Sequence, residues 1–283
     1  MSAVAYREAT EPILRADDIA AWDIWMRTAA VHARTQAFRR HVDSAKRAVD
    51  RALAKSRKAC FSWSAGKDST DGSHLVTVEM GYREVELLSE KDDLDFPGEE
   101  AYVTDLAAAW GATLRIVRPA ISPAAFIEAA ALRGEIHAGD DIHGRAAALS
   151  KACFYKVMEE ADRAYDVVML GLRAEESGMR RMVREKRGLV YELASRGGQV
   201  RANPLGDWTG LDVFAYAESR GIPMLHVYRC IGLMHRDKPW RLRKSWWLPG
   251  SGSARGQIVW LERYYPSLFR RLVSWMPHAS LFR

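Results

Sequence analysis

The stretch Phe61-Ser62-Trp63-Ser64-Ala65-Gly66-Lys67-Asp68-Ser69-Thr70 joins a predicted strand to a predicted helix. Residues 59–63 are mostly apolar and favour a strand, and residues 69–81 favour a helix. A helix start offers unpaired backbone N–H groups and the positive end of the helix dipole, and small residues let an anion approach the backbone. The sequence therefore predicts a phosphate-binding turn here.

The side chains of this turn favour a nucleotide. Lys67 supplies a mobile positive charge, and Ser64 and Ser69 supply hydroxyl groups. A carboxylate beside phosphates, at Asp68, is explained if it holds Mg²⁺. The turn is not a Walker A loop, because that motif requires glycine where this chain has Phe61, and Ser or Thr where it has Asp68.

The turn resembles the Ser-Gly-Gly-x-Asp-Ser pyrophosphate loop of the adenine nucleotide α-hydrolase superfamily, with Ala65 in place of the first glycine. That superfamily includes ATP pyrophosphatases, the small subunit of ATP sulfurylase and phosphoadenylyl-sulfate (PAPS) reductase. The alternative is a Gly/Ser turn that contains Lys-Asp by accident, since short motifs recur by chance.

The composition is that of an ordinary globular protein, with 48% hydrophobic and 28% charged residues among 283. No apolar run reaches the roughly 18 residues of a membrane-spanning helix, and the N-terminus lacks a signal-peptide pattern. We therefore expect a cytoplasmic protein with no membrane partner. The three cysteines are far apart and form no CxxC pair, so we expect neither a disulfide framework nor an iron–sulfur cluster.

The positive charge is concentrated near the C-terminus. From Arg229 onward there are eleven Lys and Arg against two Asp and Glu, whereas the preceding residues carry 31 against 34. Such asymmetry indicates an anionic partner for the C-terminal segment.

The pattern along the chain predicts an α/β protein with a doubly wound, mostly parallel sheet. Residues 17–58 lack Gly and Pro and favour one or two amphipathic helices, interpreted as a packing or dimerisation element. Predicted strands and helices then alternate, which indicates crossover connections. After the first strand at 59–63, we expect strands at 84–88, 114–117 and 166–170, and helices at 97–110, 123–132 and 145–164.

A second polar group, from Gly171 to Arg181, follows the strand predicted at 166–170. Ligands bind at the carboxyl ends of such strands, which puts this group beside the turn. Guanidinium groups bind oxyanions, whereas the structural alternative is a self-paired charge run. The segment also resembles the family pattern Gly-x-Arg-x-x-Glu-Ser-x-x-Arg, which implies anion or acceptor binding by Glu176, Ser177, Arg180 and Arg181.

A third segment, Asn203 to Tyr216, resembles the Pro-Leu-x-x-Trp-Thr-x-x-Asp-Val-Trp segment of PAPS reductases, with Thr209 as a helix N-cap. Weaker similarities lie at Phe96–Val103 and Cys153–Val157. The resemblance runs in order from about residue 58 to 232. We therefore expect three parts: a helical extension (1–57), the nucleotide-binding domain (58–232) and a helical, basic segment (233–283).

The chain departs from the family in its cysteines. PAPS reductases use a cysteine in a C-terminal tail as nucleophile, but here no cysteine follows Cys230. A thiol step needs a thiolate at the substrate, and we interpret Cys230 as a buried structural residue.

The tail interleaves Trp and Arg from Trp240 to Trp247, which fits either a lid over the nucleotide or a single-stranded nucleic-acid contact. Pro266 is predicted to divide the last segment into two helices.

The resemblance implies an enzyme that binds ATP or PAPS with Mg²⁺ and cleaves the α–β phosphate bond, adenylylating an acceptor and releasing pyrophosphate. Lys67, Asp68 and Arg173 are the expected catalytic residues, with Asp68 holding the metal. The expected nucleotide-binding residues are Ser62, Ser64, Ala65, Gly66, Lys67, Asp68, Ser69, Leu88, Gly171 and Arg173. Three alternatives stay open: a sulfonucleotide reductase using Cys230, a nucleic-acid modifying enzyme, and a non-catalytic nucleotide sensor. A homodimer or a second subunit also stays open.

Overall fold

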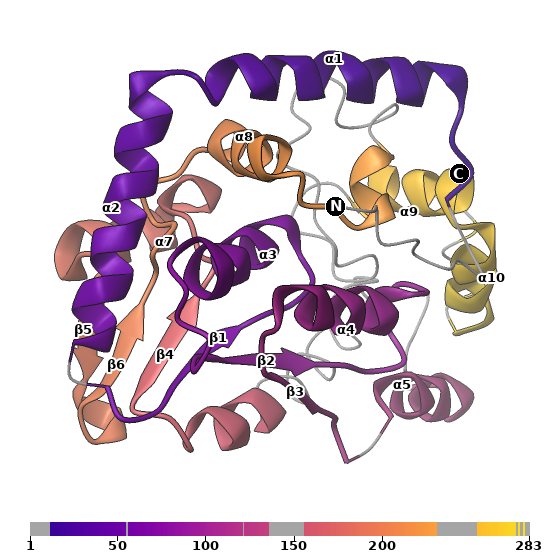
Figure 1. The fold of residues 1–283 in the computed structure, drawn as a ribbon. Helices are drawn as coiled ribbons and strands as arrows, with labels where there is room; N and C mark the ends of the chain where they lie inside the picture. Colours follow the sequence, from indigo (N-terminus) through magenta and orange to yellow (C-terminus); the bar gives the residue numbers. More distant parts are fainter. Residues whose placement is uncertain are drawn as a thin grey trace.

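The computed structural model describes residues 12–54, 56–120, 122–135, 156–230 and 254–275, with 277 and 280. Its centre is a six-stranded sheet with the order β3-β2-β1-β4-β6-β5 (Figure 1). The strands are β1 Ala59–Ser62, β2 Glu86–Glu90, β3 Leu114–Val117, β4 Val167–Leu170, β5 Val190–Leu193 and β6 Gln199–Ala202. Neighbouring strands are parallel except β5, which runs antiparallel to β6. The predicted doubly wound, mostly parallel sheet is confirmed.

Strand β1 is one of the two central strands, and its sequence suits that position. Ala59, Cys60 and Phe61 are buried, as expected for a parallel strand covered on both faces. Phe61 lies opposite Leu87 of β2 and Met169 of β4. The chain first winds outward from β1 to β2 and β3, then returns to β4 on the other side of β1. This reversal makes the carboxyl ends of β1 and β4 a topological switch point, the place where ligands bind in such sheets.

Helices cover the sheet and extend beyond it. They are α1 Ala16–His32, α2 Gln36–Leu53, α3 Lys67–His74, α4 Glu99–Trp110, α5 Pro123–Leu132, α7 Gly178–Arg187, α8 Gly210–Arg220, α9 Ala254–Tyr264 and α10 Pro266–Trp275. A π-helical turn, η1 Leu75–Glu79, continues α3, and the 3-10 turns are η2 Ala174–Glu176, η3 Ala194–Arg196 and η4 His226–Arg229. None of the described helices is both long and apolar enough to cross a bilayer.

Most predicted boundaries agree with the structure to within a few residues. Thr209 caps α8 as predicted, since its Oγ1 accepts from the backbone N of Asp212 at 3.2 Å. Pro266 begins α10 and separates it from α9, also as predicted. Residues 156–162 are helical, and the earlier part of the helix predicted over 145–164 lies outside the described residues. The sequence analysis named neither β5 nor β6.

The two N-terminal helices pack against the core. Figure 1 shows α1 running across one end of the molecule and α2 descending beside the sheet. The buried carboxylate of Asp212 on α8 binds His32 Nε2 at 2.7 Å and His41 Nδ1 at 2.9 Å, which joins both helices to α8. Near the other end of α1, Asp18 accepts from Tyr264 Oη at 2.6 Å. Polar contacts at both ends therefore fix α1 to the core.

Candidate active site at the carboxyl end of the sheet

The predicted phosphate-binding turn closes on itself through its two serines. Ser69 Oγ accepts from the backbone N of Ser64 at 3.1 Å and donates to the carbonyl of Gly66 at 3.0 Å. The hydroxyls of Ser64 and Ser69 lie 3.0 Å apart. Ala65 has a φ of 58°, a left-handed conformation that favours glycine. The related pyrophosphate loops have glycine at this position, so the alanine here keeps a glycine-like backbone.

The first backbone N–H of α3 points at a tyrosine. Gly66 caps the helix without a side-chain hydrogen bond, and the N–H of Lys67 donates to Tyr228 Oη at 2.9 Å. Tyr228 is buried, and burial raises the pKa of its phenol well above the ordinary value, so the group stays neutral. The sequence analysis assigned Tyr228 no role. Its position inside the region of resemblance was the only available signal.

Lys67, Asp68 and Arg173 form one buried ion cluster. Lys67 Nζ lies 2.8 Å from Asp68 Oδ2, and Arg173 Nε donates to Asp68 Oδ1. Burial by itself would raise the pKa of Asp68, but the charges of Lys67 and then Arg173 lower it to about 2. Asp68 is therefore ionised at all physiological pH values. Its two cationic partners, Lys67 and Arg173, lie beside the turn.

Gly171 lets the chain after β4 touch the turn. A Cβ placed on Gly171 would lie 2.8 Å from both the backbone N and the Cα of Ser69, closer than real Cβ atoms approach. Only glycine fits without movement of the turn. This close approach is what brings the adjacent Arg173 within reach of Asp68.

The acidic and basic residues after Arg173 connect it to α7. Glu176 Oε2 accepts from the backbone N of Arg173 at 3.1 Å and from Arg180 Nη1. Ser177 caps α7 by accepting from the backbone N of Arg180 at 3.2 Å. Arg181 is exposed and forms no ion pair with any described residue. The structure thus brings Arg173, Glu176 and Arg180 together and leaves Arg181 on the surface.

Two further predicted residues lie behind the turn. Ser62 ends β1 and is half-buried, and Leu88 of β2 is fully buried. The carbonyl of Leu88 accepts from the backbone N of Trp63 at 2.8 Å, which extends the pairing of β1 and β2 up to the turn. Leu88 supports the turn through this backbone contact.

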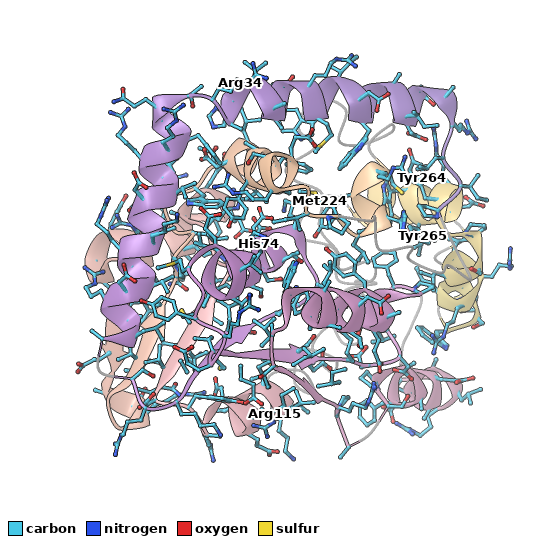
Figure 2. The ribbon with its side chains drawn as sticks, viewed as in Figure 1. Arg34, His74, Arg115, Met224, Tyr264 and Tyr265 are labelled. Atoms are coloured by element: carbon cyan, nitrogen blue, oxygen red, sulfur yellow. The ribbon has the colours of Figure 1, made fainter. Side chains whose placement is uncertain are left out.

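Asp71 is a buried acid that was not predicted from the sequence. It lies one turn after Asp68 on α3, and neither of its carboxylate oxygens has a hydrogen-bond partner among the described residues. Burial first, and the charge of Asp68 second, raise its pKa well above the ordinary value. Nearby on α3 is His74, which Figure 2 labels. Its Nδ1 lies 3.0 Å from Tyr216 Oη of α8, and burial lowers the pKa of His74 to about 4.

The carboxylate chemistry allows a magnesium ion only in partnership with phosphates. No cluster of three or more His, Cys, Asp or Glu suited to a metal occurs in the described parts of the chain. Both oxygens of Asp68 already face cations. Mg²⁺ often takes one or two carboxylates and completes its shell with phosphate oxygens and water. Asp68 fits that mode as a single protein ligand.

The described cysteines are unsuited to nucleophilic chemistry in this conformation. Cys60 and Cys230 are buried, and burial strongly raises the pKa of both thiols. The carbonyl of Cys230 accepts from Trp260 Nε1 at 3.0 Å, which fixes it in the core beside α9. Cys153 lies outside the described residues.

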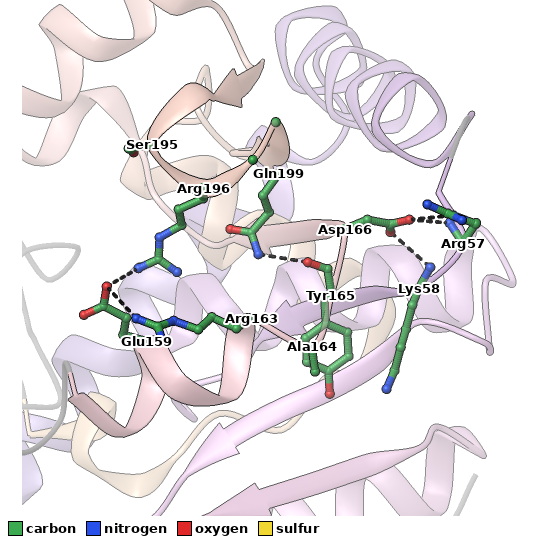
Figure 3. Close-up of a pocket in the computed structure, with 12 residues that line it drawn as sticks. Arg57, Lys58, Glu159, Arg163, Ala164, Tyr165, Asp166, Ser195, Arg196 and Gln199 are labelled. Carbon is green, nitrogen blue, oxygen red and sulfur yellow. Dashed lines mark hydrogen bonds and ion pairs between the residues drawn. The ribbon is translucent and has the colours of Figure 1, made fainter.

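A separate cavity of about 890 Å³ opens at the opposite edge of the sheet, where β1, β4 and β6 begin (Figure 3). Its charged groups are largely paired with one another. Asp166 accepts from the backbone N of Arg57 at 2.8 Å and of Lys58 at 3.0 Å, and Arg196 Nη2 lies 3.0 Å from Glu159. The sequence analysis did not predict this cavity, and it holds none of the predicted site residues.

The parallel sheet, the turn at its carboxyl edge and the cation cluster together define a member of the PP-loop adenine nucleotide α-hydrolase superfamily. Within it, this chain belongs to the phosphoadenosine phosphosulfate reductase domain family, whose model matches residues 58–235. The suspected family is thereby confirmed. No curated protein matches the sequence.

Several solved structures are similar to this chain at low identity. A PAPS reductase from Candida auris, solved as a phosphate complex, is 18% identical, with a TM-score of 0.47 over 64% of this chain and 81% of that one. An FMN adenylyltransferase from Candida glabrata is 11% identical, with a TM-score of 0.47 over 76% and 69% of the two chains. The U34-tRNA thiolase NcsA from Methanococcus maripaludis, which holds a [4Fe-4S] cluster, is 12% identical, with a TM-score of 0.45 over 86% and 80%.

Proposed function

We propose that this protein is an enzyme that binds ATP at the Ser64–Ser69 turn and transfers the adenylyl group to an acceptor, releasing pyrophosphate. The observation that carries the proposal is the meeting of three features at one point: the N-terminus of α3, the self-closed serine turn and the ion cluster of Lys67, Asp68 and Arg173. A helix N-terminus with adjacent cations is suited to a polyphosphate. The family match supports nucleotide binding.

In the proposed reaction, a nucleophilic atom of the acceptor bonds to the α-phosphorus while the bond from that phosphorus to the bridging oxygen breaks. Pyrophosphate leaves with the bond's electron pair. Lys67 and the backbone N–H groups of the turn stabilise the charge on pyrophosphate. When Mg²⁺ is bound, it neutralises phosphate charge, and Asp68 is the residue that would hold it. Arg173 keeps Asp68 in place, whereas Arg180 and Arg181 would bind the acceptor.

PAPS is the second candidate nucleotide, because the matching family carries its name. Sulfonate transfer to a thiol would require Cys230 as a thiolate, and burial opposes that state. Adenylyl transfer requires no cysteine and is therefore the favoured reaction. We place the enzyme in the cytoplasm, and a homodimer or a second subunit is compatible with this reaction.

Calorimetric titration with ATP and with PAPS, each with Mg²⁺, tests the proposal on wild type and on Lys67→Ala and Asp68→Ala variants. ATP binding that either substitution abolishes, together with pyrophosphate release when an acceptor is present, is the expected result. Preference for PAPS, with sulfite release lost in Cys230→Ser, would replace adenylyl transfer by sulfonucleotide reduction. Nucleotide binding without pyrophosphate release from any acceptor would identify a sensor instead.

A further inference from the structure

Two helices beside the candidate active site are strongly positive, although the residues before Arg229 carry a net negative charge. Helices α2 and α7 hold ten Lys and Arg but three Asp and Glu. Outside these two helices, the residues before Arg229 include 21 of the chain's 42 basic residues and 31 of its 36 acidic residues. The two helices therefore form a positive region on an otherwise acidic body.

A shared carboxylate holds the two helices side by side. Asp207 accepts from Ser44 Oγ of α2 at 3.3 Å and from Arg184 Nε of α7 at 2.6 Å. Both helices also lie at the β6–β5 edge of the sheet (Figure 1). The two helices meet along one line on the surface. Side chains on the same face as Ser44 in α2, or as Arg184 in α7, therefore lie along that line.

Arginines occupy that line on both helices. On α2, Arg40, Arg47 and Arg51 share the side of Ser44, because the spacings of four, three and four residues keep them on one face. All three are exposed, and none forms an ion pair with a residue the structure describes. On α7, Arg180 and Arg187 share the side of Arg184 by the same spacing. The row from Arg40 to Arg51 is about 16 Å long at about 1.5 Å per residue.

We propose that this arginine surface, made of Arg40, Arg47 and Arg51 of α2 with Arg180, Arg184 and Arg187 of α7, binds the phosphodiester backbone of a nucleic acid. Duplex DNA carries about one negative charge per 1.7 Å when both strands are counted, so a duplex segment as long as this row carries about ten phosphates, and some of them face the row. Guanidinium groups bind phosphate oxygens bidentately, and the charged residues of the α2 row are all arginine. A membrane surface fits less well, because apolar residues suited to insertion are absent from the α2 row.

The surface is continuous with the candidate active site. Arg180 at the start of α7 binds Glu176, which also accepts from the backbone N of Arg173, and Arg173 binds Asp68. A polymer bound along the helices would thus pass the turn that is proposed to hold ATP. The inference rests on the proposed adenylyl transfer in one respect only: it names a nucleic acid as the acceptor.

The test is fluorescence anisotropy with labelled single-stranded RNA and duplex DNA of about 30 nucleotides, across a salt series, using the full chain without nucleotide. Wild type should bind at least one probe with a steep salt dependence. The triple variant Arg40→Ala/Arg47→Ala/Arg51→Ala should bind about tenfold or more weakly. Its log–log salt slope should be shallower by about two to three, since each lost phosphate contact contributes about 0.7–0.9.

The matched control is Arg27→Ala/Arg57→Ala/Arg270→Ala, which removes three exposed arginines elsewhere and the same charge. It should bind almost as wild type does. If both triple variants bound the probe equally weakly, net charge would explain the effect and the proposed arginine surface would be wrong. Wild-type affinity in the α2 variant would also contradict the proposal. Binding to anionic phosphatidylserine vesicles but to neither nucleic acid would also overturn it.

ATP titration of the α2 triple variant separates this inference from the proposed function. The substituted residues lie outside the nucleotide site, so ATP affinity should stay unchanged. Conversely, Lys67→Ala should lose ATP and still bind the probe. If wild type bound the probe but not ATP, nucleic-acid binding by the arginine surface would be supported and the proposed adenylyl transfer would be wrong. Failure of the probe to stimulate pyrophosphate release, with both ligands bound, would remove the acceptor assignment.

Discussion

Gly171, just after β4, and Ser69 of α3 approach each other so closely through their backbones that no side chain fits at position 171. A Cβ at position 171 would lie 2.8 Å from the backbone N and Cα of Ser69. This contact joins the Ser64–Ser69 turn to the segment that carries Arg173. Because the atoms that a side chain at position 171 would meet belong to the backbone of α3, they cannot yield as a flexible side chain does.

Substitution of Gly171 by alanine should therefore displace the turn. We expect Gly171→Ala to weaken ATP binding by tenfold or more, measured by calorimetry. Gly178→Ala is the matched control, because nothing lies within 4 Å of a Cβ there. Wild-type affinity in Gly171→Ala would show that the turn does not depend on this contact.

Loss of the Tyr228 hydroxyl should lower the stability of the free protein and increase the stabilisation that ATP provides. Tyr228→Phe removes the acceptor from the backbone N–H of Lys67, and an unsatisfied buried donor costs about 1–3 kcal/mol of unfolding free energy. A phosphate could then take the freed N–H, so ATP should raise the melting temperature of the variant more than that of wild type. Urea denaturation and thermal unfolding measure these effects.

Tyr82→Phe controls for loss of a hydroxyl, because the Tyr82 phenol donates to Asp50 at the surface. It should change neither the unfolding free energy by more than a few tenths of a kcal/mol nor the stabilisation by ATP. Equal stabilisation of wild type and Tyr228→Phe by ATP would mean that the phosphate does not use the Lys67 N–H.

The ion pair of Asp68 and Arg173 should behave as a coupled unit. Arg173→Met leaves the buried Asp68 with Lys67 as its remaining cation, and removing one partner of a buried pair costs about 3–5 kcal/mol. The double variant Asp68→Asn/Arg173→Met should lose less than the sum of the two single variants. Urea denaturation of all four proteins gives the coupling energy. Strict additivity would mean that the two side chains stabilise the fold independently.

His74 should make the protein less stable in mild acid. Burial lowers its folded pKa to about 4, whereas the unfolded residue has a pKa of about 6.5. Between these values the unfolded state binds a proton that the folded state does not, so stability falls as pH drops from 6.5 to 4. The loss due to this residue reaches at most about 3 kcal/mol at the acid end.

The variant His74→Asn removes this titration while keeping a polar partner for Tyr216 Oη. The difference in unfolding free energy between wild type and variant should shift in favour of the variant as pH falls from 7 to 4. Urea denaturation at several pH values measures it. A difference that stays constant with pH would mean that His74 titrates normally in the folded protein.

The sequence by itself determined the elements whose signals are local. The turn and the start of α3 follow from small residues and a helix start, and α10 begins at Pro266 because proline suits a first helical turn. The parallel sheet follows from apolar strands that alternate with helices. The Asp68 carboxylate and the Lys67 cation were also evident, since both belong to the turn itself.

Tertiary structure alone decided the contacts that complete the site. Arg173 reaches Asp68 from 105 residues away and Tyr228 reaches Lys67 from 161, distances that no local pattern encodes. Strand β6 escaped prediction because its polar residues become buried only through long-range partners: Arg201 binds Asp162 at 2.6 Å, and Gln199 donates to the carbonyl of Tyr165. Local patterns fix backbone shape, but the pairing of buried polar groups depends on which distant segments the sheet brings together.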